Sequence, residues 1–286
     1  MKRLLAVPFL VAAAFPLLAQ TQPAPAPAPS LPCRPADATI NAVLWMQTSA
    51  EYQALLRQAY SNAARTLDQA IADPTWTAAL EQPSTAAALP PAIVLDLDET
   101  MLDTSPHQQG LIVNGRAYTE EGWHQYAMTD ASRPLEAAVD FVTYAKQRGV
   151  AVYYVTNRRK SEEEALRATL VKGNFPLDAN EDTVLTRDEK PEWSSSDKAP
   201  RREFVARTHR IVMLFGDDLN DFLPANGKTL AERDKLTRQY GEKWGRQWFI
   251  LPNPVYGSWE RQMLGDTTGV DDCAQLQRKI RTIKGR

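Results

Sequence analysis

Four acidic side chains crowd into eight positions directly after an apolar run. In the stretch AIVLDLDETMLD, the run AIVL has the composition of a buried strand, and it is followed by Asp96, Asp98, Glu99 and Asp103. Like charges at the end of a core strand repel one another unless a cation compensates them or some of them stay protonated. The spacing therefore predicts a site that binds a cation or transfers protons.

A second acidic cluster has the same setting. Asp217, Asp218 and Asp221 lie in GDDLNDF, directly after the apolar run IVMLF. Several carboxylates around one point suit a hard divalent cation, and Mg²⁺ binds through few carboxylates while keeping several waters. A solvated acidic loop is the alternative. Because both clusters follow buried strands, we favour a shared Mg²⁺ site made by Asp96, Asp98, Asp217 and Asp221.

A hydroxyl, a lysine and two polar neighbours complete the set. Thr156 ends the apolar run in YYVTNRR, and Lys198 precedes a predicted helix. A metal, a lysine and a hydroxyl together neutralise and position a phosphoryl group, and a carboxylate such as Asp96 can attack it as a nucleophile. Asn157 and Arg158 follow Thr156 and are candidates for contact with the phosphate, although for Arg158 a surface role is the alternative. These residues together indicate phosphoryl transfer.

The elements that must position these residues alternate along the chain. Apolar runs predict strands at 92–96, 150–155, 183–185, 211–215 and 248–251. Periodicity and capping signals predict helices at 37–71, 134–148, 162–172, 197–208, 230–244 and 271–283. We therefore expect an α/β fold: a Rossmann-like parallel sheet with helices on both faces, N-terminal helices and a small, mainly helical cap inserted around 105–133. Ligands of such sheets bind at the carboxyl ends of the strands, so the polar clusters should converge on one crevice.

The first 32 residues predict export from the cell. Lys2 and Arg3, followed by a short apolar run, are typical of a signal peptide at 1–20, with a retained membrane anchor as the alternative. The Pro/Ala-rich stretch 21–32 predicts an extended linker, so a single folded domain should span 33–286. We expect a periplasmic or secreted bacterial protein without a stable membrane span.

The cysteines and the net charge narrow the remaining possibilities. Cys33 lies well downstream of the apolar run, so we do not expect a lipid anchor. Cys33 and Cys273 could form a disulfide in an exported protein, but sequence positions alone give no geometry, and two unpaired thiols are the alternative. The net charge of −2 and the lack of a basic run argue against binding of a nucleic acid polymer.

Taken in order, DLDET, the strand-end Thr156, Lys198 and GDDLND resemble the four motifs of the haloacid dehalogenase superfamily of phosphotransferases. A narrower resemblance, over nearly the whole mature chain, is to the class C acid phosphatases, which include outer-membrane lipoprotein 5′-nucleotidases of bacteria. The segments that carry this resemblance are WMQTSAEYQALLRQAY, DLDETMLDTSP, YVTNR, GDDLNDF and LPNPVYGSWE. Class B acid phosphatases share the four motifs, but the segments at 45–60 and around Tyr256 fit class C better.

The resemblance implies a role for most matching positions. Asp96 would attack phosphorus, and Asp98 would protonate the leaving alcohol and then activate the water that hydrolyses the aspartyl-phosphate. Mg²⁺ would be held by the Asp96 side chain, the backbone carbonyl of Asp98 and the Asp217 side chain. Thr156 would hydrogen-bond the phosphoryl oxygens. A bound cation would also explain why so many carboxylates are tolerated at the end of one strand.

Three further positions follow from the same resemblance. Lys198 would neutralise charge on the nucleophile and the phosphate, and Asp221 would orient Lys198 or a metal-bound water. Asp218 stands where relatives often have asparagine, so the resemblance gives it no role.

Two aromatic residues suggest the substrate. Trp123 in the expected cap and Tyr256 match family positions whose rings enclose a nucleobase, whereas simple packing of the cap is the alternative. Stacking on an aromatic ring is worth about 1–3 kcal/mol per base and tolerates different bases. We therefore expect an exported, Mg²⁺-dependent phosphomonoesterase for nucleoside monophosphates. A broad-specificity acid phosphatase and a catalytically silent binding protein are the alternatives, and the resemblance also suggests a homodimer.

Overall fold

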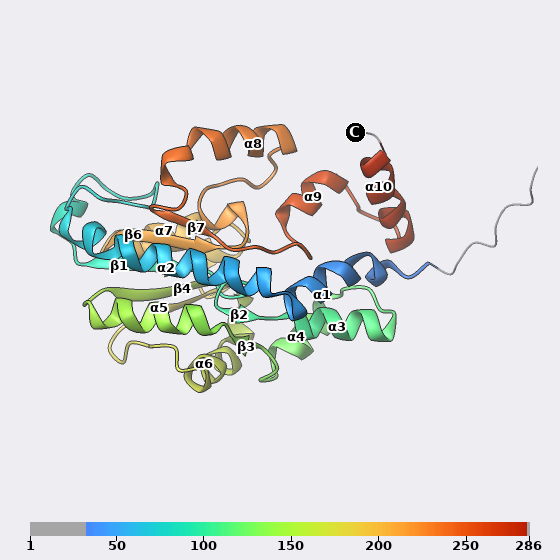
Figure 1. Ribbon diagram of the computed structural model, residues 1–286, viewed down its shortest axis with the longest axis horizontal. Coiled ribbons are helices and arrows are strands. Elements are labelled where there is room, and N and C mark those ends of the chain that lie inside the picture. Colours follow the sequence, from blue (N-terminus) through green and yellow to red (C-terminus); the bar gives the residue numbers. More distant parts are fainter. Residues whose placement is uncertain (1–32, 285–286) are drawn as a thin grey trace, which may run out of the picture. The chain divides into compact units, whose positions relative to one another are not determined.

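A five-stranded parallel sheet forms the centre of the protein, seen in Figure 1 in a computed structural model that describes residues 33–284. The strands, in spatial order, are β5 (Val184–Arg187), β4 (Ala151–Arg159), β1 (Pro91–Leu95), β6 (Arg210–Gly216) and β7 (Trp248–Ile250). Every neighbouring pair is parallel. The central strands β1 and β6 are buried almost throughout, which explains their unbroken apolar sequences. The predicted α/β class is confirmed.

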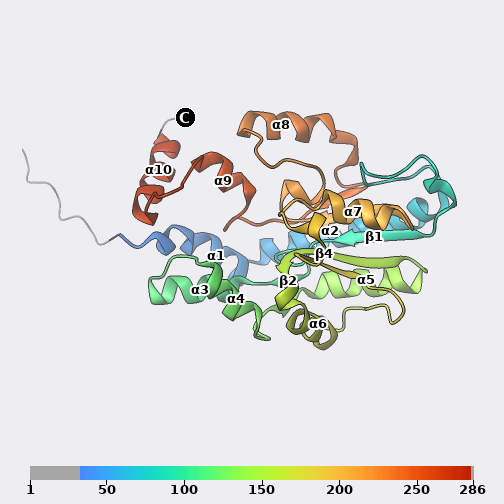
Figure 2. The same ribbon diagram turned by 180° about the vertical axis from the view of Figure 1, so that it is seen from behind.

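Helices cover both faces of this sheet. One face packs against α2 (Ala50–Ala72), α5 (Glu136–Gln147) and α6 (Glu163–Lys172), and its core includes Tyr60, Phe141 and Phe215. The other face packs against α7 (Ala199–Ala206) and α8 (Leu230–Gln239). Figure 1 is seen from the side of α2, and Figure 2 from the side of α7.

The helix expected at 37–71 is interrupted at one residue. A short 3₁₀ helix at Pro35–Thr39 leads into α1 (Ile40–Thr48), and α2 begins only after Ser49. Ser49 has extended dihedral angles, and its hydroxyl accepts a hydrogen bond from the backbone N–H of Tyr52. This is an N-cap, which starts a new helix with its own direction.

The insertion after β1 is mainly helical. It contains α3 (Ser105–Asn114) and α4 (Glu120–Ala127), and it is bounded by the two-residue antiparallel strands β2 (Leu102–Asp103) and β3 (Arg133–Pro134). The sequence predicted that Pro134 opens a helix. Instead, Pro134 lies in β3, and α5 begins at Glu136.

The C-terminal part holds one element that the sequence did not predict. α9 (Ser258–Leu264) precedes α10 (Asp272–Lys284), and these two helices pack against each other. Within residues 33–284, no helix is both long and apolar enough to cross a bilayer. The predicted signal peptide and linker lie outside the described residues. Neither Cys33 nor Cys273 is a free thiol, and their pairing with each other stays a prediction.

Candidate active site

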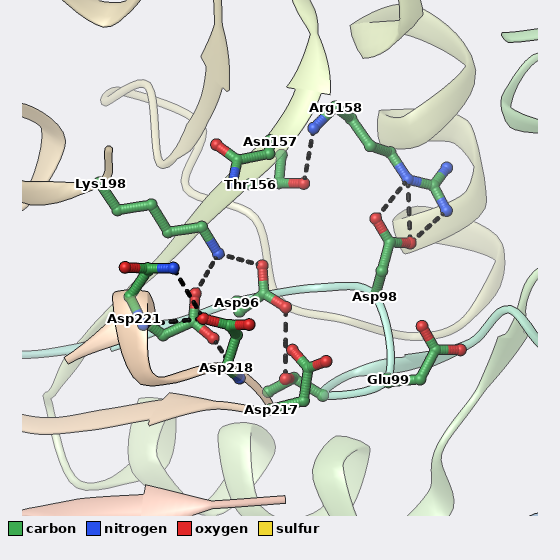
Figure 3. Close-up of polar contacts among 12 residues, drawn as sticks. Asp96, Asp98, Glu99, Thr156, Asn157, Arg158, Lys198, Asp217, Asp218 and Asp221 are labelled. Carbon is green, nitrogen blue, oxygen red and sulfur yellow. Dashed lines mark hydrogen bonds and ion pairs between the residues drawn. The ribbon is translucent and has the colours of Figure 1, made fainter. Parts of the chain in front are cut away.

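The carboxyl ends of three neighbouring strands carry the polar clusters to one place. Asp96 follows β1, Thr156 lies near the end of β4, and Asp217 follows β6. Lys198 joins them from the position just before α7. Figure 3 shows these side chains turned toward one another, which is the convergence that the strand order requires.

Three carboxylates form a compact cluster. Asp96, Asp217 and Asp221 each offer an oxygen atom, and these atoms lie within 4.8 Å of one another. Lys198 donates from its ammonium group to Oδ1 of Asp96 and, at 2.6 Å, to Oδ1 of Asp221. Lys198, Asp96 and Asp221 are only 4%, 8% and 6% exposed. An all-oxygen set of this kind fits a hard divalent cation, held by these three aspartates.

Burial and charge crowding raise the pKa values of two members of the cluster. Burial and the neighbouring charges of Asp96 and Asp221 raise the pKa of Asp217 well above its usual range. Burial also raises the pKa of Asp221 to about 7, although Lys198 opposes the shift. The positive charge of Lys198 does not balance three carboxylates, and a divalent cation would supply the additional positive charge.

This arrangement predicts how pH and metal act together on stability. In the metal-free protein, Asp221 keeps its proton up to about pH 7, while the unfolded chain loses it near 3.8. The folded state then binds more protons in this window, so the free energy of unfolding should fall as pH rises through it. Added Mg²⁺ should raise the melting temperature more at about pH 8 than at about pH 6, as calorimetry can measure.

The control for this prediction is Asp221→Asn, which removes the titrating group. Without metal, the fall in the free energy of unfolding between the two pH values should shrink in that variant, a readout that does not depend on its weakened metal binding. An equal effect of Mg²⁺ at both pH values in the wild-type protein would contradict the prediction.

Asp98 lies apart from the three-carboxylate cluster. Its carboxylate accepts hydrogen bonds from Nε of Arg158 at 3.1 and 3.2 Å and from Nη2 at 2.7 Å. The resemblance implies that Asp98 binds the metal through its backbone carbonyl. The side chain can therefore have another role. The Asp98 side chain is 17% exposed, whereas that of Arg158 is 1% exposed.

Arg158 is therefore not a surface residue, and that alternative is wrong. Besides Asp98, its guanidinium donates to Oγ of Ser132 at 3.0 Å and lies over the ring of Trp123, 5.4 Å from the centroid. One guanidinium nitrogen, Nη1, is buried and has no hydrogen-bond partner among residues 33–284. The structure places Arg158 behind Asp98, where it fixes the direction of that carboxylate.

The end of β4 presents its polar groups in two directions. Thr156 is completely buried, and its Oγ1 accepts from the backbone N–H of Arg158 at 3.1 Å. Its hydroxyl proton therefore remains available for an acceptor such as a phosphoryl oxygen. Asn157 lines the pocket beside Asp96 and donates to the backbone carbonyl of Ser196 at 3.2 Å.

Sequence reasoning missed two residues that orient the acids. Thr100 donates to Oδ2 of Asp96 at 3.3 Å, and Asn253 donates to Oδ2 of Asp217 at 2.7 Å. Both stand inside segments already singled out, DLDET and LPNPVYG, so the family motifs could have indicated them. Gly216 is also required, because a Cβ there would come within 2.2 Å of a carboxylate oxygen of Asp221.

Asp218 has a structural role in this site. It caps the turn by accepting from the N–H of Asn220, and it accepts from both the N–H and the hydroxyl of Ser258. Burial acts to raise the pKa of Asp218, but these hydrogen bonds outweigh it and hold that pKa below the usual range. Asp218 thus ties the acidic loop to the start of α9.

The acids open into a pocket of about 610 Å³ that reaches the cap and the C-terminal helices. Trp123 and Tyr256 both line it, as the sequence predicted, and so does Tyr118, which the sequence analysis did not single out. Trp123 packs against His107 and Tyr126 with ring centroids 5.3 and 5.6 Å apart. Tyr118 is 51% exposed and offers a more accessible ring.

Glu99 connects the nucleophile loop to this aromatic wall. It is completely buried, has a left-handed backbone (φ 58°), and accepts from the backbone and the hydroxyl of Thr104 at 2.9 and 2.6 Å. The hydroxyl of Tyr256 donates to its other carboxylate oxygen. Burial, with the nearby charge of Asp98, raises the pKa of Glu99 well above its usual range. Glu99 therefore fixes the position of Tyr256.

A parallel sheet with these groups at its strand ends defines a phosphatase of the haloacid dehalogenase type, and comparison with known proteins agrees. The model of the HAD superfamily, subfamily IIIB (acid phosphatase), matches residues 18–259, so the chain belongs to this family of acid phosphatases. It is similar to the class C acid phosphatase from Bacillus anthracis, at 32% identity and a TM-score of 0.77 over 87% of this chain and 98% of that chain. For that enzyme with tungstate bound, the identity is 32% and the TM-score 0.76, over 86% and 96% of the two chains. The predicted family and enzyme class are confirmed.

Proposed function

We propose that this acid phosphatase hydrolyses nucleoside monophosphates through an aspartyl-phosphate on Asp96, with Mg²⁺ as its cation. The observation that carries the proposal is the fixed direction of the Asp96 carboxylate. One oxygen accepts from Lys198 and the other from Thr100, at the point where the acid cluster meets the pocket. A nucleophile held at both oxygens loses little entropy on reaching the transition state.

The side chains can share the two chemical steps. In the first, Asp96 forms a bond to phosphorus as the ester bond breaks, and the leaving alcohol takes a proton from Asp98. In the second, Asp98 removes a proton from water, which attacks phosphorus, releases phosphate and restores Asp96. We expect Lys198 and the hydroxyl proton of Thr156 to interact with the phosphoryl oxygens. A bound cation would add positive charge that stabilises the charge developing on those oxygens.

Two further observations support Mg²⁺ as the cation and a phosphate group as the ligand. The three clustered aspartates offer only oxygen ligands, which Mg²⁺ prefers. The similar class C enzyme from Bacillus anthracis has a structure with tungstate bound, and tungstate is a tetrahedral oxyanion like phosphate. Release of phosphate from a nucleoside 5′-monophosphate should therefore require Mg²⁺ and stop in the presence of a chelator.

The aromatic wall of the pocket supports a nucleoside as the leaving group. Tyr256 and Tyr118 line the same pocket as Asp96, and the hydroxyl of Tyr256 is already bound to Glu99. The ring of Tyr256 is thus held in place before substrate arrives, so stacking a base on it costs little ordering entropy. Trp123 lines the same pocket, and its packing against His107 and Tyr126 holds its ring in place as a second stacking partner.

Replacing Tyr256 tests this specificity. Tyr256→Ala should raise KM for a nucleoside 5′-monophosphate about tenfold, within the range for loss of one stacking partner. It should leave KM for ribose 5-phosphate unchanged, because that substrate lacks the base. Steady-state kinetics on both substrates gives the comparison.

The matched control is Tyr256→Phe, which keeps the ring and removes only the hydroxyl bond to Glu99. It should retain most of the preference for the nucleotide. If Tyr256→Ala changed KM equally for both substrates, the enzyme would be a broad-specificity acid phosphatase, the second candidate function.

Export and assembly are part of the same proposal. The N-terminal sequence supports a periplasmic or secreted enzyme, and fractionation of cells that produce the full chain tests it. A homodimer, suggested by the family, is tested by light scattering.

A further inference from the structure

We infer that two consecutive buried arginines of α7, Arg201 and Arg202, are positioning residues with separate tasks: Arg201 sets the phosphate-binding end of β4 and Arg202 sets the metal-binding loop. Neither is among the residues that line the pocket, and both are completely buried. They lie within four residues of Lys198, on a helix that packs against both β4 and β6. The inference rests on the proposed function, because it assigns the ligands of that same site.

Arg201 is bound to the last residues of β4. Its Nη1 donates to the backbone carbonyl of Thr156, and its Nη2 donates at 2.7 Å to Oδ1 of Asn157 and at 3.2 Å to the carbonyl of Asp197. The planar guanidinium thus holds Thr156 and Asn157 against the segment that carries Lys198. These are the residues expected to contact the phosphoryl group, so Arg201 acts on the phosphate through them.

Arg202 is bound to the loop that follows β6. Its Nη1 donates to the backbone carbonyls of Asn220 and Asp221 at 3.2 and 3.0 Å. Its other nitrogens bind the carboxylate of Glu81, with distances of 2.7 and 3.2 Å. Glu81 lies in the segment between α2 and β1, outside the pocket. Arg202 therefore anchors the backbone of a clustered aspartate to a distant part of the fold.

The geometry explains why both positions need arginine. Each guanidinium makes bonds in two directions at once, which the single ammonium group of lysine cannot reproduce. Residues that orient a metal ligand from behind typically change metal affinity about 10- to 100-fold when they are replaced. Because the two arginines bind different segments, replacing one arginine should weaken the binding of one ligand, phosphate or metal, and leave the binding of the other unchanged.

The first experiment compares Arg201→Lys and Arg202→Lys, which both keep the charge. Binding of Mn²⁺ to the metal-free protein is followed by electron paramagnetic resonance, and binding of inorganic phosphate by calorimetry at saturating Mg²⁺. Arg202→Lys should weaken the binding of Mn²⁺ about tenfold and change the affinity for phosphate by less than about twofold. Arg201→Lys should show the reverse pattern: its affinity for phosphate should fall about tenfold, and its affinity for Mn²⁺ should stay nearly unchanged.

Arg210→Lys is the matched control. Arg210 is also a buried arginine, but it binds only backbone carbonyls, those of Ala70, Ile71, Asp73 and Trp76, at the opposite end of β6. Its replacement should lower stability without changing either affinity. Equal loss of both ligands in all three variants would overturn the inference, because it would show only general loosening of the fold.

A remote and a combined variant keep the test decisive if a lysine variant folds poorly. Glu81→Gln weakens the anchor of Arg202 from outside the pocket and should weaken Mn²⁺ alone. Arg201→Lys combined with Asn157→Ala should bind phosphate no worse than the poorer single variant, because Arg201 acts partly through Asn157. Additive losses, or unchanged Mn²⁺ binding in Glu81→Gln, would overturn the corresponding assignment. A wild-type protein that bound neither ligand would overturn the proposed function and this inference with it.

Discussion

Asp96→Asn is expected to lower kcat for phosphomonoester hydrolysis by more than about 10⁴-fold, as loss of a nucleophile does in other enzymes. The amide oxygen and nitrogen are too weakly nucleophilic to attack phosphorus. Among residues 33–284, no second carboxylate bonds to both Lys198 and Thr100. The protein should stay folded, because Lys198 keeps its bond to Asp221. Phosphate release, with circular dichroism as the check on folding, measures both expectations.

Asp217→Asn separates loss of the nucleophile from loss of the cation. This variant keeps Asp96 and removes one of the three clustered carboxylates, so raising the Mg²⁺ concentration should restore part of its activity. No Mg²⁺ concentration should restore Asp96→Asn. Asp68→Asn, a change on α2 at a surface ion pair with Arg148, serves as the neutral control. Comparable recovery of Asp96→Asn and Asp217→Asn with metal would show that Asp96 is only a metal ligand.

The sequence allowed the strand ends to be predicted because their signal is local. Buried parallel strands are short apolar runs, and the residues that follow them must lie at one edge of the sheet. Asp96, Thr156 and Asp217 could therefore be placed together before any coordinates were known. The break at Ser49 was less clear, since a serine inside an amphipathic pattern is also compatible with an uninterrupted helix.

The support behind the site could not be predicted in this way. Arg202 and Glu81 are far apart in sequence, and Arg158 binds Asp98 across the crevice; neither pairing follows from spacing. The direction of a long side chain depends on which neighbours exclude it from water, and that is known only once the sheet and helices are packed. For the same reason, the sequence alone did not show that Arg158, which lines the pocket, pairs with Asp98.

Asp98→Asn is expected to have the second largest effect, and the effect should depend on the leaving group. For a nucleoside monophosphate, kcat should fall by about 10²- to 10⁴-fold, the usual contribution of a general acid or base. For p-nitrophenyl phosphate, whose leaving group departs without a proton, Asp96 should still be phosphorylated, but water can no longer be activated. Rapid mixing should therefore show a burst of about one p-nitrophenolate per site, followed by slow turnover.

The position of Asp98 makes this comparison clean. Asparagine keeps the oxygen that accepts from Nε and Nη2 of Arg158, so the side chain should stay close to where the carboxylate was. It loses its ability to transfer protons, its negative charge and the contact between the second oxygen and Nε. Asp103→Asn, in the same DLDETMLD segment, is the matched control. Within the described part of the chain, the Asp103 carboxylate accepts only from the N–H of Ser105, and it lies outside the pocket. An equal loss on both substrates without a burst would mean that Asp98 is needed before Asp96 attacks, as a positioning residue. A burst would instead assign proton transfer in both steps to Asp98, and Arg158 would then be the residue that holds it ready.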